Sequence, residues 1–173
     1  MGCLFNILMK KILLVRHAKS DWENSELNDF DRPLNRRGQK NAPEMAGRLL
    51  KAGLIPEILV TSPALRALTT AECFADVLSI ERSAIIKEPQ IYEASSSTLL
   101  NIINSLDNKH HFAALIGHNP GLTNLAVNLC NSDVYNIPTC GMVLIHFPFD
   151  QWDMISYWTG DQKLYDYPKN VAE

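Results

Sequence analysis

Short, mostly apolar runs alternate with amphipathic segments along this chain. The runs predict buried strands, and they lie at residues 11–15, 58–60, 84–86 and 112–116. Apolar residues recur at helical spacing in the segments that follow, and these segments end near residues 51, 77, 106 and 129. This alternation predicts an α/β fold, a three-layer α/β/α sandwich around a mostly parallel sheet.

Capping residues indicate where the helices begin. Asn41 followed by Glu44 is typical of a helix N-terminus, so we expect a loop over residues 18–40 and a helix from residue 41. Ser62 followed by Pro63 is a second such start, because proline favours the first helical position.

The two ends of the chain carry weaker signals. Residues 142–147 and 151–158 alternate as strands and are expected to form a hairpin, followed by a loosely ordered polar tail at 161–173. Residues 1–9 are expected to be a short extension. We therefore predict a single domain whose core spans about 10–160.

Composition narrows the class of protein. The chain has 173 residues, 46% hydrophobic and 20% charged, as in ordinary globular domains. Its net charge of −3 gives no general attraction to nucleic acid or to an acidic membrane. No apolar run approaches the roughly 20 residues of a membrane span, and no basic leader with a cleavage site is evident. The four cysteines, none at C-x-x-C spacing, are expected to be reduced thiols in the cytoplasm.

Arg16 and His17 stand at the end of the first predicted strand. In open α/β sheets, ligands bind at the carboxyl ends of the strands, so both side chains are expected at a binding edge. An imidazole beside a guanidinium indicates chemistry on an anion, and a phosphoryl group fits both. Arg-His pairs also occur by chance, so this interpretation depends on the later segments.

Two further residues are expected at the same edge. Arg66 lies in the first turn after Ser62-Pro63, and His118 follows the strand at 112–116. Each has a simpler interpretation, Arg66 as an exposed helical arginine and His118 as a histidine in a tight loop. Together with Arg16 and His17 they could bind the phosphoryl oxygens and place a neutral imidazole for attack.

Other candidates lie in loops. Glu93 is expected to be partly buried near the site, where a raised pKa would suit a general acid, although a solvated carboxylate is the alternative. Arg32 could reach the pocket mouth or pair with Asp29 or Asp31. Asn119, beside His118, is a candidate substrate-binding residue.

The other histidines are assigned no role in the chemistry. His110 and His111 precede a strand and are expected on the surface at the opposite edge, and His146 is expected to be structural. A catalytic metal is not expected, because metal-ligand motifs are absent and arginines beside both site histidines would repel a cation. No cofactor is expected.

Four segments, taken in order, resemble the histidine phosphatase superfamily, which has the phosphoglycerate mutase-like fold. They are Leu14-Val15-Arg16-His17-Ala18, the segment 61–71 (Thr-Ser-Pro-x-x-Arg-Ala-x-x-Thr-Ala), Tyr92-Glu93 and Gly117-His118-Asn119-Pro120-Gly121. Residues 16–22, 31–38 and 91–95 carry a narrower resemblance to SixA-type phosphohistidine phosphatases. The resemblance covers about residues 10–160.

The resemblance implies roles for these residues. His17 would be the nucleophile and become transiently phosphorylated, while Arg16, Arg66 and a cationic His118 would form the phosphate pocket. Glu93 falls near the proton donor of the superfamily. Ala18 replaces the glycine that is common after the Arg-His pair.

Short connections at 53–57 and 86–92 leave few residues for a lid, which favours a phosphorylated protein side chain as substrate. We therefore expect a metal-independent phosphatase for protein phosphohistidine, a cytoplasmic monomer with no nucleic-acid or membrane partner. A small-molecule phosphomonoesterase or a mutase-like enzyme is the alternative within this fold. A phosphate-binding regulatory module without turnover, and a purely structural domain, are the alternatives of another class.

Overall fold

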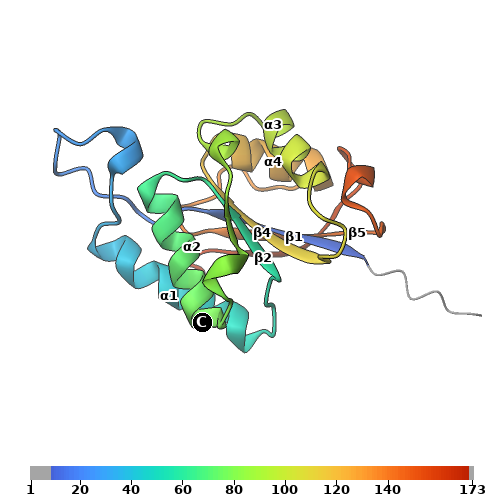
Figure 1. Ribbon diagram of the computed structural model, residues 1–173, viewed down its shortest axis with the longest axis horizontal. Helices are drawn as coiled ribbons and strands as arrows, with labels where there is room; N and C mark the ends of the chain where they lie inside the picture. Colours follow the sequence, from blue (N-terminus) through green and yellow to red (C-terminus); the bar gives the residue numbers. More distant parts are fainter. Residues whose placement is uncertain (1–8, 172–173) are drawn as a thin grey trace, which may run out of the picture.

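The computed structural model describes residues 9–171, which form a six-stranded sheet in the order β3-β2-β4-β1-β5-β6 (Figure 1). The strands are β1 (Lys10–Arg16), β2 (Ile58–Thr61), β3 (Ile85–Lys87), β4 (Phe112–Gly117), β5 (Met142–Phe147) and β6 (Asp161–Asp166). Strands β3, β2, β4 and β1 pair in parallel, whereas β5 and β6 pair antiparallel. The expected α/β class and mostly parallel sheet are confirmed.

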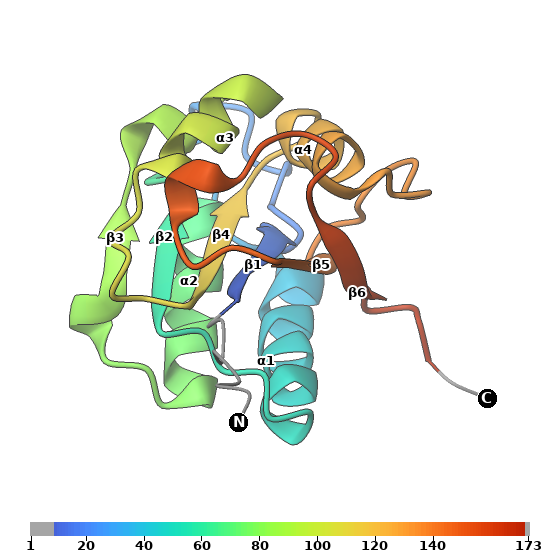
Figure 2. The same ribbon diagram turned by 90° about the vertical axis from the view of Figure 1, so that its right-hand side faces the viewer.

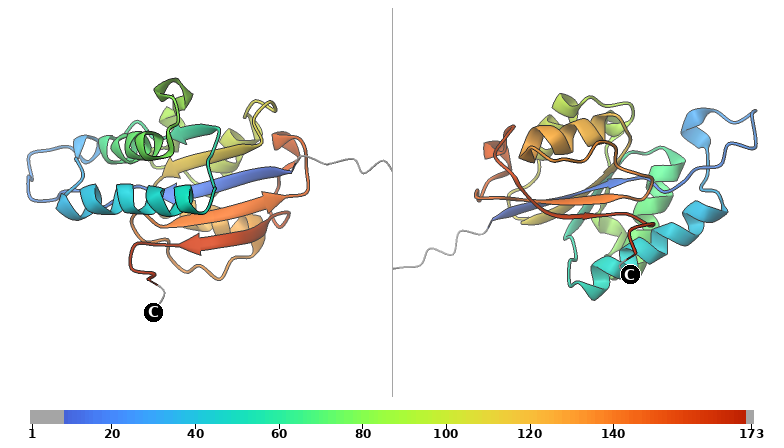
Figure 3. Two further views of the ribbon diagram at one scale, coloured as in Figure 1. Left: turned by 90° about the horizontal axis from the view of Figure 1, so that it is seen from below. Right: turned by 180° about the vertical axis from the view of Figure 1, so that it is seen from behind.

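Helices cover both faces of this sheet (Figure 2). They are α1 (Arg36–Lys51), α2 (Leu65–Leu78), α3 (Ser96–Asn104) and α4 (Gly121–Cys130). Successive residues of β1 point to opposite faces: Leu13 and Val15 pack in the core under α1 and α2, and Ile12 and Leu14 in the core under α3 and α4. Figure 3 shows α1 and α2 lying across one face of the sheet. The result is the predicted three-layer sandwich.

The first helix begins earlier than the sequence predicts. Its N-cap is Asn35, whose side chain accepts a hydrogen bond from the Gly38 amide at 2.9 Å, and the expected cap, Asn41, is buried inside the helix. The polar first turns are held by a tertiary contact, because a Cβ on Gly38 would lie 2.2 Å from the carbonyl oxygen of Lys19. The sequence pattern of 35–40 carries no apolar face that would have revealed this contact.

The C-terminal prediction is wrong in two places. Residues 151–158 contain no strand. They include a 3-10 turn, Trp152–Met154, in which Trp152 is fully buried. The sixth strand is β6, inside the segment expected to be a loose tail. Its residues are polar because β6 is an edge strand that is at most half-buried, and pairing with β5 holds it in place.

The remaining expectations concern the N-terminal segment, the cysteine thiols and a possible membrane span. The expected N-terminal extension lies outside the described residues except for Met9. Cys73, Cys130 and Cys140 are free thiols, whereas Cys3 is not among the described residues. Within residues 9–171, no helix is long and apolar enough to cross a membrane.

Candidate active site

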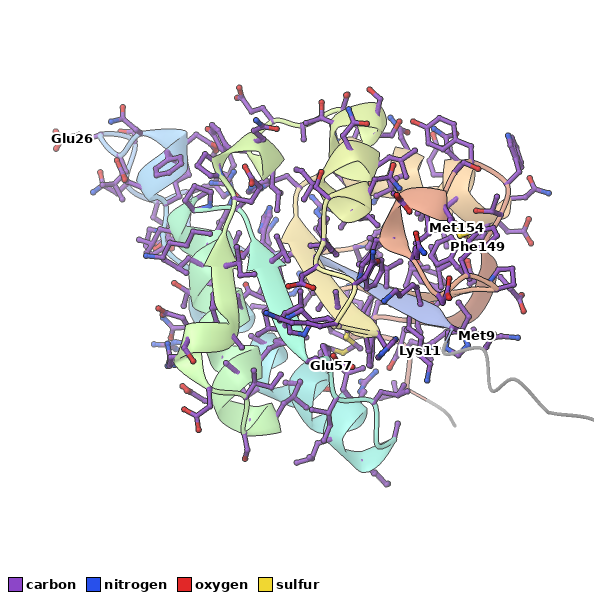
Figure 4. The ribbon with its side chains drawn as sticks, turned by 45° about the vertical axis from the view of Figure 1, so that its right-hand side comes forward. Met9, Lys11, Glu26, Glu57, Phe149 and Met154 are labelled. Carbon is purple, nitrogen blue, oxygen red and sulfur yellow. The ribbon has the colours of Figure 1, made fainter. Side chains whose placement is uncertain are left out.

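Three parallel strands end side by side and bring distant residues together. Arg16 is in register with Gly117, and Thr61 with Ile116. Just past the strands, the His17 amide donates to the Gly117 carbonyl at 3.1 Å. Figure 4 shows Glu26, in the loop that follows β1, far from Met9 at the other end of that strand. The carboxyl edge therefore collects Arg16, His17 and His118, as the sequence predicts.

His17 is buried and oriented by its own chain. Its Nδ1 lies 2.8 Å from the Ala18 carbonyl oxygen, and because that oxygen can only accept, we assign the ring hydrogen to Nδ1. The lone pair of Nε2 then faces the Arg66 Nε, 3.4 Å away. Burial, reinforced by His118 and the two arginines, lowers the pKa of His17 to about 3. At neutral pH this imidazole is uncharged, which is the form of a nucleophile.

His118 lies beside it with a ring-centroid separation of 5.1 Å. Its Nε2 is 2.8 Å from the Ser62 hydroxyl, and its Nδ1 is 3.5 Å from the Arg66 Nη2, which can only donate. Burial, followed by the charge of Arg66, lowers the pKa of His118 to about 4. At neutral pH His118 is therefore uncharged in this arrangement, which differs from the cationic form that the resemblance implies for the phosphate pocket.

The two arginines supply the positive charge. Arg66 is 7% exposed in the first turn of α2, so its interpretation as an exposed helical arginine is wrong. Arg16 donates to the Ile137 carbonyl at 2.8 Å, and its Nε is buried without a hydrogen-bond partner among residues 9–171. A buried N–H of this kind is a donor that an anion could use.

The hydroxyl groups of Thr70 and Ser62 position these residues. In the sequence, Ser62 was identified only as part of a helix start, and Thr70 only as part of the segment 61–71 that carries the family resemblance. The Thr70 hydroxyl donates to the Arg66 carbonyl at 2.7 Å and accepts from the Ala18 amide at 3.0 Å. It thereby joins α2 to the end of β1. Ser62 is fully buried and holds His118.

Asp29 is the site residue that sequence reasoning missed. It lies in a 3-10 turn, Asp29–Asp31, and its Oδ2 accepts from the Arg66 Nη2 at 2.9 Å and from the Tyr92 hydroxyl at 2.8 Å. Burial opposes ionisation, but the hydrogen bonds from Tyr92 and Arg66 outweigh it and lower the pKa of Asp29. The rings of Tyr92 and His118 pack edge to face with a centroid distance of 5.6 Å. Nothing in the polar loop around Asp29 distinguishes it from Asp31.

Glu93 differs from the expectation of a partly buried acid. It is exposed, with a left-handed backbone (φ 56°), and its side chain forms no hydrogen bond or ion pair within the described chain. Tyr92 occupies the inward position instead, because its hydroxyl reaches Asp29.

Arg32 and Asn119 have partners of their own. The Arg32 guanidinium lies 4.1 Å from the centre of the Trp22 ring and pairs with neither Asp29 nor Asp31. The Asn119 amide nitrogen donates to the Asn136 side chain and to the Ile137 carbonyl, both at 2.9 Å. Asn119 therefore holds the loop that also receives Arg16.

The remaining histidines and possible metal ligands lie apart from this site. His110 and His111 contact Glu57 at the opposite edge, where they were expected. His146 lies half-buried in β5. Among residues 9–171 no group of three or more histidine, cysteine or acidic side chains is arranged to hold a metal ion.

Comparisons with known proteins agree with this geometry. Residues 12–110 match the family profile of the histidine phosphatase superfamily, branch 1. An uncharacterised chloroplastic protein of Arabidopsis thaliana is 26% identical over 154 residues, 84% of this chain and 70% of that protein. A 2,3-bisphosphoglycerate-dependent phosphoglycerate mutase of Dichelobacter nodosus is 32% identical over 111 residues, which are 63% of this chain and only 43% of the mutase.

Solved structures share the whole fold. A putative phosphohistidine phosphatase SixA of Agrobacterium tumefaciens superposes with a TM-score of 0.78 at 23% identity, covering 92% of this chain and 98% of its own. A protein histidine phosphatase SixA complexed with tungstate has the same TM-score and coverage at 21% identity. The profile match ends at residue 110, before His118. The pairing of β1 with β4 is what places His118 beside His17. This chain belongs to branch 1 of the histidine phosphatase superfamily.

Proposed function

We propose that this enzyme hydrolyses phosphohistidine on proteins, with His17 as the nucleophile. The Nε2 of His17 attacks phosphorus, and the P–N bond of the substrate breaks with its electron pair passing to the departing imidazole, which leaves as the neutral ring. Water then attacks the phosphorus of phospho-His17, and the P–N bond breaks with its electron pair returning to Nε2. Both protons of the water leave on dihydrogen phosphate, and the imidazole is restored as the neutral ring. Arg16, Arg66 and His118 bind the non-bridging oxygens during both steps.

The phosphoryl dianion would itself alter His118. A negative charge beside the ring opposes the effects of burial and of Arg66, and so favours the imidazolium. His118 would thus gain a second donor when the substrate binds. This coupling makes His118 a phosphate ligand in the complex without requiring it to be charged beforehand.

The pairing of Asp29 with Arg66 and Tyr92 is the observation that carries the choice of substrate. An alkyl ester needs a protonated acid at its leaving oxygen. Arg66 and Tyr92 keep Asp29 in the carboxylate form, and Glu93 is exposed to solvent. A phosphohistidine needs less help, because an imidazole that is protonated on its other nitrogen leaves without an acid from the enzyme.

A short connection beside the site supports a substrate as large as a protein. Eight residues join β3 to α3, at 88–95, whereas the other short connection, at 52–57, joins α1 to β2 at the opposite edge. A connection of eight residues cannot build a deep lid over the carboxyl edge of the sheet. In this proposal the enzyme acts as a cytoplasmic monomer on a phosphorylated protein.

The test is single-turnover phosphate release by the wild type and by His17→Ala. A phosphohistidine-bearing carrier protein and p-nitrophenyl phosphate serve as substrates side by side. Fast release from the carrier, lost in His17→Ala, supports the proposal. Faster turnover of the ester would move the enzyme to the small-molecule phosphatases, and binding without turnover would make it a phosphate-binding module.

A further inference from the structure

A groove lined by basic residues lies on the same end of the molecule as the active site. Its first part, about 730 Å³, is lined by Lys19, Trp22, Arg36 and Arg37 among others. Its second part, about 640 Å³, shares both arginines and continues to Lys40 and Lys169. We refer to these six residues as the basic groove. Figure 1 shows the loop that follows β1 and the start of α1 at one end of the molecule.

The cations of the basic groove are available to a partner. Within residues 9–171, none of its five lysines and arginines forms an ion pair. Three carboxylates also line it, those of Asp21, Glu23 and Glu44, against five lysines and arginines. Glu44 is already paired with Arg48 at 2.9 Å, and Asp21 accepts from the Glu23 amide at 2.8 Å. Positive charge therefore predominates locally in a chain whose net charge is −3.

The position of Arg36, Arg37 and Lys40 opposes the stability of the helix that carries them. They occupy the first turns of α1, where the helix dipole favours acidic residues, and the first turn contains no acid. Basic residues placed where they are unfavourable for their own helix are typical of a binding site.

An exposed aromatic residue adds a second, independent feature. Trp22 is 62% exposed on the rim of the basic groove, yet the Arg32 guanidinium holds its ring at 4.1 Å. Tryptophan contributes strongly to protein interfaces when it is covered.

The basic groove is fixed rigidly to the catalytic strand. Lys19 follows His17 by two residues, and its carbonyl accepts from the Asn35 amide at 3.0 Å while Gly38 packs against it. A bridge between Ser20 and Leu34 closes the base of the loop. A partner seated in the basic groove would therefore reach the active site in a defined register.

We infer that the basic groove binds an acidic segment of the phosphorylated protein, on one side of its phosphohistidine. Charge complementarity identifies this occupant, and the exposed Trp22 and the unpaired cations supply the contacts. The inference rests on the proposed function, since it identifies the part of the substrate that is recognised outside the reacting group.

The test uses phosphohistidine peptides that differ only in a flanking run of glutamates or of glutamines. For the wild type, the acidic flank is expected to lower KM about tenfold with kcat unchanged, and added salt should remove this preference. Arg36→Glu/Arg37→Glu should abolish it. Lys51→Glu/Lys87→Glu, with the same change in charge at exposed lysines away from the groove, should retain it.

Two further measurements test this inference independently of the proposed phosphohistidine hydrolysis. Unphosphorylated acidic peptide, followed by fluorescence anisotropy, should bind the wild type and not the groove variant, whether or not either peptide is hydrolysed. The groove variant should melt no lower than the wild type, because glutamates suit the first turn of α1. Equal KM for both flanks, a preference that survives in the groove variant, or tighter binding of polyphosphate than of peptide would overturn the inference.

Discussion

At the scale of single residues, reactivity comes from burial as much as from residue type. His17 and His118 both lie between arginines and both are held neutral, but they are held in different tautomers. The carbonyl of Ala18 fixes the hydrogen of His17 on Nδ1, whereas Arg66 forces the hydrogen of His118 onto Nε2. The Nε2 of His17 therefore carries a free lone pair, whereas the Nε2 of His118 carries a hydrogen that it donates to Ser62.

Nitrogen-15 NMR would test this assignment. We expect both imidazoles to stay neutral at pH 5.5, where an exposed histidine is mostly protonated, since their pKa values are lowered to about 3 and about 4. His17 should show protonated Nδ1 and His118 protonated Nε2. Protonation of His17 near pH 6.5 would contradict the account of its burial.

Asp29 competes with a phosphoryl group for the same guanidinium. Asp29→Asn is expected to strengthen inhibition by orthophosphate about tenfold, roughly 1.4 kcal/mol, because Arg66 is released and a negative charge is removed. The inhibition constant measured in a competition assay checks this. Asp31→Asn, an exposed neighbour with no contact to Arg66, should leave it unchanged. Similar effects of both substitutions would mean that Asp29 acts only through long-range charge.

At the scale of secondary-structure elements, the sequence predicted the buried apolar strands and missed the elements that are made of polar residues. The strands at 11–15, 58–60 and 112–116 could be predicted because a central strand is buried on both faces, so its sequence is a continuous apolar run. The first turn of α1 and strand β6 are polar, and they exist because of contacts far away in the sequence. The site divides in the same way. Arg16, His17 and His118 were predictable from the ends of strands, whereas Asp29 reaches the site through a loop.

Arg48 shows how such a polar segment is held. From α1 it donates to Asp166 at 3.0 Å, to Glu44 at 2.9 Å, and to the carbonyls of Tyr167, Pro168 and Asn170 at 3.1 Å each. These bonds attach the end of β6 and the segment that follows it to the helix. They replace the apolar burial that this stretch of chain lacks.

Arg48→Ala is therefore expected to lower the free energy of unfolding by about 2 kcal/mol, because several carbonyls and two carboxylates lose a charged donor. Urea denaturation measures the loss. Arg82→Ala provides the matched control, since Arg82 is 53% exposed and binds only surface acids, so its loss should cost about 0.5 kcal/mol or less. Equal effects of the two substitutions would show that the C-terminal segment does not depend on Arg48.

At the scale of the whole molecule, the active site makes folding depend on pH. The unfolded chain binds protons at histidine near pH 6.5, whereas the folded chain keeps His17 and His118 neutral until about pH 3 and pH 4. Stability from this source is complete above pH 6.5 and falls as the pH drops toward the folded pKa values. Each histidine costs about 1.4 kcal/mol per pH unit in that window.

Urea denaturation between pH 7 and pH 4.5 should therefore show a falling free energy of unfolding, with a slope that approaches two protons. In His118→Gln the slope should decrease by one proton, whatever that substitution does to the absolute stability, because only the titration of one ring is removed. Asp29 would add its own loss at lower pH, since its pKa is lowered and its contribution disappears as the carboxylate is protonated. A stability that stays flat across this window would mean that both rings are solvated. The buried neutral nucleophile on which the proposed reaction depends would then be absent.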